Sequence, residues 1–335
     1  MIELDGSMGE GGGQIIRTAL SLSAITGKAF KIQNIRANRT PPGLKPQHLT
    51  AVNAMEEICG AHVTGAELGS TSLEFTPGKM IPGEYKFDIG TAGSVTLLLQ
   101  TILPAALSAE GNIEIEAKGG TNVPHAPPID HFIHVFLQTL KAHGARIEAD
   151  LVRRGYYPKG GGTVMIEIWP GHVKPIELTE FTLGNVHCIS FASGRHESAA
   201  RRQENYAKLE LLKQKIIPTT IIEDSKADCP GGGVQFIASS KTSKALLGAD
   251  ALWDETKPDD KVGTEAAQAL LLELSKNPAV DRHMADQLLI YLALSGGRIR
   301  TSEITQHTTT NIQVIEKFLP ARFEIKETTI EAKPA

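Results

Sequence analysis

One histidine near the end of the chain is a candidate nucleophile. His307 lies in the segment SEITQHTTTN at residues 302–311, between hydroxyl side chains in a polar stretch. An imidazole has a pKa near 6.5, so most of it is neutral and nucleophilic at pH 7. A loop histidine is more often simply solvated. The residue type and its neighbours therefore leave both interpretations open.

Three polar residues outside this segment could share a site with His307. Asp286 and Gln287 fall at the predicted start of a helix, and Gln100 falls on the corresponding helix of an earlier unit. If the units pack around a common axis, these side chains meet in one cleft. Asp286 equally fits a helix N-cap and Gln100 a surface position. The sequence does not separate these alternatives.

A glycine-rich loop, GEGGGQIIR at residues 9–17, leads into the first predicted helix. Exposed backbone N–H groups and the positive end of a helix dipole favour a phosphate there. The loop lacks the GK[ST] of a Walker A sequence, and a tight strand-to-helix turn explains the glycines equally well. Glu10 would repel a phosphate unless a metal ion bridges the two.

The strongest local positive charge follows this loop. Residues 11–55 contain no Asp or Glu. The cationic or titratable residues there are Arg17, Lys28, Lys31, Arg36, Arg39, Lys45 and His48. The loop at 36–48, RANRTPPGLKPQH, is stiffened by proline, and arginine forks suit phosphate oxygens. The alternative is a solvated loop, but the absence of acidic residues favours binding of a polyanion.

The elements that must position these residues follow a threefold pattern. The predicted helices cover residues 14–25, 48–59, 94–107, 129–143, 286–294 and 311–318. Each pair of helices is followed by two strands, and Gly-Ala marks the exit from the second helix at Gly60 and Gly144; Pro320-Ala321 replaces it in the third unit. Chance alternation in an α/β chain is the competing explanation. We predict an α+β fold of three repeated helix–helix–strand units.

The third unit is interrupted. Its opening strand, at 176–182, is separated from its first helix by a stretch that is predicted to hold a strand, a helix, two strands around a glycine-rich turn and another helix. We therefore predict a large domain at residues 1–182 and 277–335, and a smaller inserted α+β domain at 183–276. Roughly 95 residues is an ordinary domain size.

The composition of the chain excludes several classes of protein. The chain has 335 residues, 41% hydrophobic and 21% charged, with a formal net charge of −4. These values exclude a disordered, fibrous or uniformly basic protein. Three distant cysteines support neither a zinc site nor a disulfide framework. With no secretion signal and no apolar run of about 18 residues, the chain is predicted to be soluble and cytoplasmic.

Seven separated blocks, in order, carry a resemblance to a known family. They are LDGSMGEGGGQIIRTALSLS, NIRANRTPPGLKPQHLTAV, GTAGSVTLLLQTILPA, KGGTNVPHAPPID, YYPKGGG, HMADQLLIYLALSGG and TSEITQHTTTN. On these blocks the chain resembles the RNA 3′-terminal phosphate cyclases over essentially its full length. The resemblance implies three repeated α+β units plus an inserted smaller domain, in agreement with the pattern above.

The resemblance also implies a reaction. His307 corresponds to the nucleophile that attacks the α-phosphate of ATP and forms a covalent histidine–AMP. The 3′-terminal phosphate of RNA then takes the AMP, and the adjacent 2′-OH closes a 2′,3′-cyclic phosphate. DNA lacks that hydroxyl, so it could be adenylylated but not cyclised.

Further site residues are implied by the same resemblance. Glu10 would help to hold a divalent metal, Mg²⁺ or Mn²⁺, at the ATP phosphates. Arg17, Arg36, Arg39 and Gln47 would bind phosphates. The nucleotide site would be lined by Gln100, Pro127, His283, Met284, Ala285, Asp286 and Gln287. Of these, Asp286 would lie near the ribose or metal and Pro127 against adenine. His283 departs from the tyrosine that many members stack on adenine, and an imidazole offers less area.

The sequence leaves two alternative functions open. One is a cyclase-like ribosomal RNA processing factor that binds without adenylyl transfer; such relatives lack the nucleophilic histidine, which is present here. The other is an enolpyruvyl transferase, which shares a related repeated fold and needs no reactive histidine. The inserted domain has no assigned role, because its arginines at 195, 201 and 202 fit an RNA guide and a solvated helix start equally well.

Overall fold

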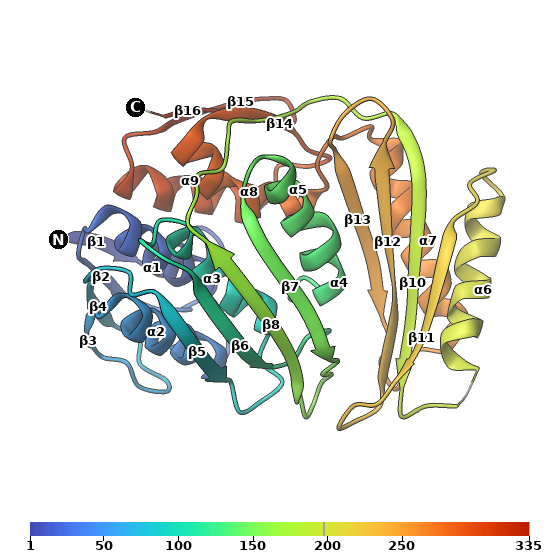
Figure 1. The fold of residues 1–335 in the computed structure, drawn as a ribbon, viewed down its shortest axis with the longest axis horizontal. Helices are drawn as coiled ribbons and strands as arrows, with labels where there is room; N and C mark the ends of the chain where they lie inside the picture. The colour runs from blue at the N-terminus through green and yellow to red at the C-terminus, as the bar shows by residue number, and fades with distance from the viewer. Residues whose placement is uncertain (197, 335) are drawn as a thin grey trace.

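The computed structural model describes residues 1–196 and 198–334. The first unit, at the left of Figure 1, runs β1 (Ile2–Asp5), α1 (Gln14–Thr26), β2 (Phe30–Gln33), α2 (Pro46–Cys59), β3 (His62–Thr64) and β4 (Leu73–Thr76). The second unit runs β5 (Gly83–Asp88), α3 (Val95–Ala106), β6 (Ile113–Gly119), α4 (Ile129–His131), η1 (Phe132–Leu137), α5 (Gln138–Ala142), β7 (Arg146–Arg153) and β8 (Gly162–Trp169).

The third unit is built from segments on both sides of an insertion. It begins with β9 (Ile176–Leu178) and resumes with α8 (Arg282–Ser295), β14 (Gly297–Arg300), α9 (Gln306–Phe318), β15 (Arg322–Lys326) and β16 (Thr329–Lys333). In β14, Gly297 pairs in parallel with Ile176 of β9, across more than a hundred residues of sequence.

The three units share one sheet topology. Their strand orders are β1-β2-β4-β3, β5-β6-β8-β7 and β9-β14-β16-β15. In each sheet the first two strands pair in parallel, across a helical crossover, and the remaining pairs are antiparallel. This repetition confirms the predicted α+β fold of three units. The parallel pair requires a long crossover, and α1, α3 and α8 supply it.

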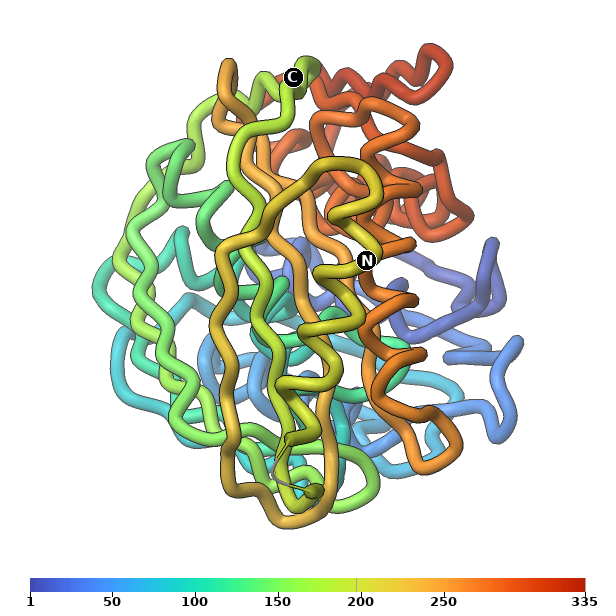
Figure 2. Tube along the Cα trace, turned by 90° about the vertical axis from the view of Figure 1, so that its right-hand side faces the viewer, coloured from blue at the N-terminus to red at the C-terminus, as the bar shows by residue number. Residues whose placement is uncertain are grey.

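The insertion forms a fourth sheet of a different order. Its elements are β10 (Leu183–Ser193), α6 (Ala199–Leu212), β11 (Thr219–Ser225), β12 (Gly231–Ser240), β13 (Leu246–Leu252) and α7 (Asp259–Ser275). The strand order is β11-β10-β12-β13, and α6 and α7 lie together on one face of this sheet (Figure 2). The domain boundaries at 182/183 and 276/277 remain a prediction.

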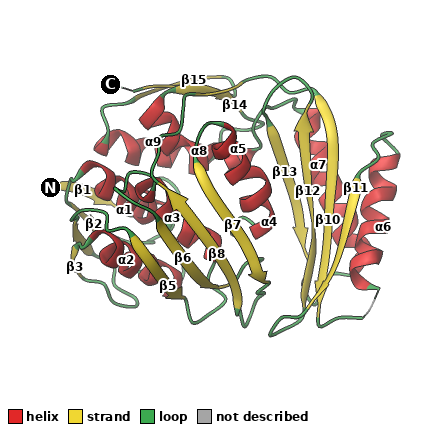
Figure 3. Ribbon diagram, in the orientation of Figure 1, coloured by secondary structure: helices red, strands yellow, loops and turns green. Residues whose placement is uncertain are grey.

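The crossover helices gather between the sheets of the three units (Figure 3). The residues of α3 are all buried except Gln100, as expected of a helix that is apolar on every side. Gln100 is therefore the one position at which α3 presents a polar side chain to a partly open space. No helix in residues 1–196 and 198–334 combines the length and the apolar character needed to cross a membrane.

Several predicted boundaries are wrong. The helix predicted at 286–294 begins at Arg282, because the side chain of Asp281 caps it by accepting from the backbone N–H groups of His283 and Met284. Asp286 is therefore inside the helix and is not its N-cap. The helix predicted at 311–318 begins at Gln306 behind the cap Thr305, so His307 lies in a first helical turn and not in a loop.

Some elements were not predicted. The helical run at 129–143 contains a π-helical segment, Phe132–Leu137. The short strands β1, β5, β13 and β14 were also not predicted, and each of them is paired with a neighbouring strand in its sheet.

A buried ion pair joins the second unit to the inserted domain. Both Nη atoms of Arg154 contact the carboxylate of Asp130, at 2.7 and 2.8 Å, and Arg154 Nη2 also donates to Glu223 Oε2 on β11 at 2.7 Å. The guanidinium lies 4.0 Å from the ring centroid of Phe191 on β10. Arg154 is 2% exposed, so these contacts replace its hydration entirely.

We expect removal of this guanidinium to destabilise the fold. Arg154→Ala leaves the carboxylate of Asp130 buried without its cation, which costs about 3–5 kcal/mol. The neighbouring pair of Arg153 with Asp228 is exposed, so Arg153→Ala should change stability by less than about 1 kcal/mol. Urea denaturation of the two variants measures this difference. Equal stabilities would contradict the role of Arg154.

Candidate active site

Residues near the N-terminal ends of three helices meet at the candidate site. Gln14 begins α1, Asp286 lies in α8, and His307 lies in the first turn of α9. The amide of Gln14 joins them: its Nε2 donates to Asp286 Oδ2 at 2.7 Å, and its Oε1 lies 3.0 Å from His307 Nδ1. Gln14 is 7% exposed, so the bridge is largely shielded from water. One side chain thus connects the first unit to both helices of the third.

This bridge indicates which nitrogen of His307 carries the proton. Because the Gln14 NH₂ group is directed at a carboxylate oxygen, its carbonyl oxygen faces His307 Nδ1 as an acceptor. The neutral imidazole therefore carries its hydrogen on Nδ1 and leaves the lone pair on Nε2. The side chain is 48% exposed. This tautomer and this exposure suit a nucleophile.

Glu10 lies against the same imidazole. Its Oε2 is 2.7 Å from His307 Nδ1, and its other oxygen pairs with Arg39. The loop that carries it passes close to α9: Gly9 has φ +57°, and a Cβ there would collide with the side chain of Thr310. Thr310 Oγ1 accepts from the backbone N–H of Glu10 at 3.4 Å. Glycine at position 9 therefore allows the loop to reach the histidine.

The environment lowers the pKa of His307 from its ordinary 6.5. Partial burial is the main cause, and the positive charges of Arg17 and Arg39 act in the same direction, whereas the carboxylate of Glu10 raises it. The imidazole is therefore neutral at physiological pH, as a nucleophile must be.

Asp286 and Arg17 titrate abnormally because they are poorly solvated. Burial raises the pKa of the Asp286 carboxyl to about 7, although the charge of Arg17 and the hydrogen bond from Gln14 act to lower it. Burial also lowers the pKa of the Arg17 guanidinium to about 10, with Asp286 and Glu10 opposing the shift. At neutral pH the pair holds a full positive charge and a partial negative one.

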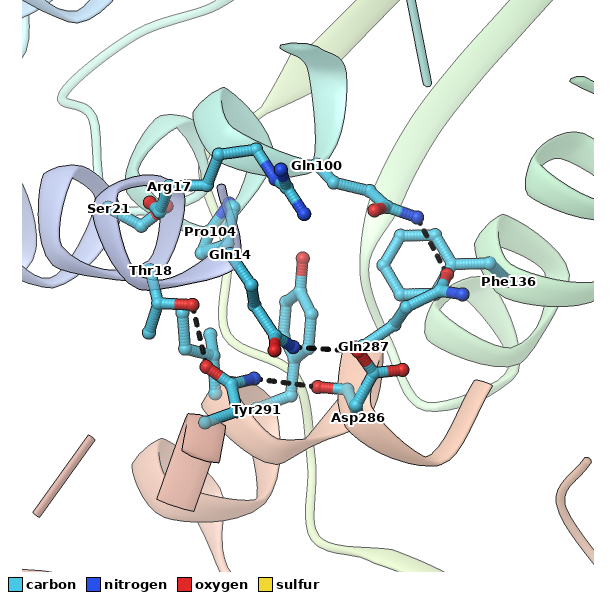
Figure 4. A pocket seen from close by; sticks show the side chains of 12 residues that line it. Gln14, Arg17, Thr18, Ser21, Gln100, Pro104, Phe136, Asp286, Gln287 and Tyr291 are labelled. Carbon is cyan, nitrogen blue, oxygen red and sulfur yellow. Dashed lines mark hydrogen bonds between the residues drawn. The ribbon is translucent and has the colours of Figure 1, made fainter. Parts of the chain in front are cut away.

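A cavity of about 60 Å³ opens beside these groups (Figure 4). It lies among α1, α3 and α8, and its lining includes Gln14, Arg17, Gln100, Asp286 and Gln287. Gln100 Nε2 donates to Gln287 Oε1 at 2.7 Å, so the second and third units are joined here as well. The structure thus brings five polar side chains from all three units to one place.

The side chains of the predicted segment 283–287 point in different directions, because the segment lies on the helix α8. Asp286 and Gln287 face the cavity, and His283 is exposed. Met284 and Ala285 are fully buried in the hydrophobic core, so their side chains do not face the cavity. The sequence-based assignment of all five as lining residues did not account for the period of the helix.

Part of the basic loop at residues 36–48 bonds to itself: side chains of the loop contact its own backbone. Arg36 Nη1 donates to the carbonyls of Pro41 and Gly43, and burial lowers its pKa. His48 is 5% exposed, and burial with nearby cations lowers its pKa to about 3, so it adds no positive charge. The cationic character of this segment therefore rests on its lysines and arginines.

Two further predicted residues have structural contacts. Gln47 Oε1 accepts from the backbone N–H of Ser94 at 2.9 Å, which joins the start of α2 to the start of α3. The carbonyl of Pro127 accepts from Thr96 Oγ1 of α3 at 2.8 Å, so this half-buried proline is held beside the same helix.

The carboxylate of Glu10 could help to hold a metal ion. Its Oε2 is buried and accepts no aligned hydrogen bond among the described residues. Residues 1–196 and 198–334 contain no cluster of three or more His, Cys, Asp or Glu side chains that could bind a metal by itself. A magnesium ion held by one carboxylate together with substrate phosphates needs no such cluster. The residues present therefore fit this mode of binding.

Two residues of the site were not predicted from the sequence. Gln14 lies four residues after Glu10, at the start of α1. A glutamine side chain in such a position is commonly solvated. Tyr291 lies in the apolar run LLIYLAL, which predicts a core position, and it is 2% exposed. Neither residue carries a sequence signal, because each acquires its role from contacts between units.

Comparisons with known proteins all relate this chain to one family. A family model described as RNA 3′-terminal phosphate cyclase matches residues 8–325. A curated protein of that name from Pyrococcus furiosus is 45% identical over 331 residues, covering 97% of this chain and 95% of the relative. Similar proteins from Thermococcus onnurineus and Methanopyrus kandleri are 46% and 42% identical, covering 97% and 100% of this chain and 96% and 99% of theirs. Both bear the same name.

The charge of Glu10 should be measurable in the titration of His307. Because that carboxylate raises the pKa of the imidazole, Glu10→Gln should lower the pKa further below 6.5. An NMR pH titration, with the signal assigned by its loss in His307→Gln, checks this. The exposed His62 of β3 is the internal control, and its signal should be the same in the two proteins. A His307 pKa that stays the same or rises in Glu10→Gln would contradict the contact.

Proposed function

Because this chain belongs to the RNA 3′-terminal phosphate cyclase family, a family of ligases, we propose that it converts the 3′-terminal phosphate of RNA into a 2′,3′-cyclic phosphodiester with ATP as co-substrate. The observation that carries the proposal is the setting of His307. Its Nδ1 faces oxygens of Gln14 and Glu10, its Nε2 has no hydrogen-bond partner among the described residues, and the half-buried guanidinium of Arg17 faces the cavity beyond.

The first step is adenylyl transfer to the protein. The Nε2 lone pair of His307 attacks the α-phosphorus of ATP, a Pα–N bond forms, and the Pα–O bond to pyrophosphate breaks. The imidazole gains positive charge as the bond forms, and the carboxylate of Glu10 at 2.7 Å from Nδ1 stabilises it. Gln14 keeps the ring in the orientation that presents Nε2.

Two further transfers complete the reaction. An oxygen of the RNA 3′-phosphate attacks the α-phosphorus, and the Pα–N bond breaks, which returns the lone pair to Nε2. The ribose 2′-OH then attacks the terminal phosphorus of the RNA, loses its proton to solvent and releases AMP. This ring closure is intramolecular, so proximity supplies much of the rate.

The remaining predicted residues have roles in holding the two substrates. Arg17, Arg36 and Arg39 supply positive charge for phosphate oxygens, and Gln47 joins the start of α2 to the start of α3 beside them. Pro127 and His283 would contact the adenine, and Gln100 with Gln287 would border the nucleotide. A divalent metal, Mg²⁺ or Mn²⁺, would be held by Glu10 with the phosphates and would neutralise their charge. A cytoplasmic location stays a prediction.

Labelling with α-³²P-ATP and metal tests the covalent step. The wild-type protein should acquire an acid-labile, alkali-stable label, and His307→Ala should lose it, because no other side chain in this position offers a nitrogen lone pair. His62→Ala, at an exposed position on β3, should label normally. Absence of label on the wild type, or label undiminished in His307→Ala, would favour an RNA-binding factor or a transferase of another class.

The metal requirement tests the role of Glu10. In Glu10→Ala the concentration of Mg²⁺ or Mn²⁺ that gives half-maximal labelling should rise by about tenfold or more, as expected on loss of a group that supports a metal. Glu67→Ala, an exposed position, should leave it unchanged. An unaltered metal dependence in Glu10→Ala would remove Glu10 from the metal site.

A further inference from the structure

The polar side chains that line the cavity are almost all paired with one another. Gln14 bonds to Asp286, Thr18 to Asn311, and Gln100 to Gln287. Ser21 donates to the carbonyl of Thr101. Two polar side chains of the lining are exceptions: within the described residues, neither Arg17 nor Tyr291 makes a side-chain hydrogen bond or an ion pair.

These two side chains point into the same space. Figure 4 shows the guanidinium of Arg17 and the hydroxyl of Tyr291 directed toward the middle of the cavity, from α1 and α8 respectively. The tyrosine is 2% exposed, and its hydroxyl is buried without a partner. Buried polar groups in folded proteins are nearly always hydrogen-bonded, so an unpartnered one needs a ligand or a bound water.

The hydrogen-bonding groups and the charge of Arg17 and Tyr291 determine which kind of ligand fits. A guanidinium can only donate, and a phenol hydroxyl that faces it gains most by donating to the same acceptor. One of the two groups is positively charged, so the fitting acceptor is an anionic oxygen. We propose that Tyr291 and Arg17 together hold one phosphoryl group in this cavity, which makes Tyr291 a substrate-binding residue. The inference rests on the proposed function for the source of that phosphoryl group.

The volume of the cavity agrees with the size of a phosphate group. A cavity of about 60 Å³ corresponds to roughly four to six water-sized spheres. A phosphate group, counted with the oxygen that bridges it to the rest of the substrate, has five heavy atoms, and this volume can hold it.

The carboxyl of Asp286 does not prevent an anion from binding here. Its Oδ2 is occupied by the Gln14 amide, and its pKa of about 7 leaves it partly protonated at neutral pH. A protonated carboxyl adds a donor to the cavity rather than a repelling charge.

The phosphoryl group has two possible sources, the phosphate tail of ATP and the 3′-phosphate of RNA. Calorimetric titration of the full-length protein with inorganic pyrophosphate probes the first. Titration with a short oligoribonucleotide ending in a 3′-phosphate, compared with the same oligomer ending in 3′-OH, probes the second. Both probes bind without chemistry, so the result does not depend on adenylylation.

The test compares Tyr291→Phe with a matched control. The variant keeps the ring and removes the hydroxyl, and loss of a hydrogen bond to a charged group should weaken one of the two probes by about tenfold or more. Tyr156→Phe removes a hydroxyl from an equally buried tyrosine, which stacks on Phe191 beside the inserted domain, and should change neither affinity. Equal thermal unfolding of Tyr291→Phe and wild type shows that the fold is intact.

Each outcome decides the proposal. Weaker pyrophosphate binding assigns the cavity to the ATP tail, and a smaller preference for the 3′-phosphate over the 3′-OH oligomer assigns it to the RNA end. Affinities that match wild type for both probes would overturn the proposal and leave the cavity to water. Because labelling of His307 is measured separately, a protein that binds the probes through Tyr291 but is never labelled would contradict the proposed function and not this site.

Discussion

The two hydrogen bonds of Gln14 are the interaction on which the site depends. The amide has one orientation that satisfies both contacts, with its NH₂ group toward Asp286 and its oxygen toward His307 Nδ1. That orientation determines the tautomer of the histidine and joins the N-terminal parts of α1, α8 and α9. Because Gln14 belongs to the first unit and both partners to the third, the site exists only when the chain has brought its two ends together.

The repeated architecture explains how a small volume can hold such different groups. The crossover helices α1, α3 and α8 are equivalent elements of three units with the same strand order, and they converge between the sheets. Each contributes polar residues at the point of convergence: Arg17 from α1, Gln100 from α3 and Asp286 from α8. Poor solvation there moves the pKa values of Arg17 and Asp286 toward each other, to about 10 and about 7. The cavity is consequently positive at neutral pH, as binding of phosphate groups requires.

Much of this organisation could be predicted from the sequence, because it follows from local signals. The threefold order of helices and strands, the insertion within the third unit and the candidates Glu10 and His307 all depend on glycine stops, apolar periodicity and short polar motifs. Other features depend on distant contacts. The capping of α8 by Asp281 determines the phase that sends Asp286 to the cavity and Met284 to the core. Burial makes His48 neutral, and the meeting of units gives Gln14 and Tyr291 their surroundings, so no spacing in the sequence reveals them.

The central claim is that Gln14 and Glu10 hold His307 with Nδ1 protonated and Nε2 free to react. The most direct test is to adenylylate protein carrying ¹⁵N-labelled histidine and to determine by NMR which ring nitrogen couples to ³¹P. The account predicts coupling to Nε2 of His307, with Nδ1 still bearing hydrogen. Coupling to Nδ1 would contradict it, because that nitrogen could bond to phosphorus only after leaving Gln14 and Glu10.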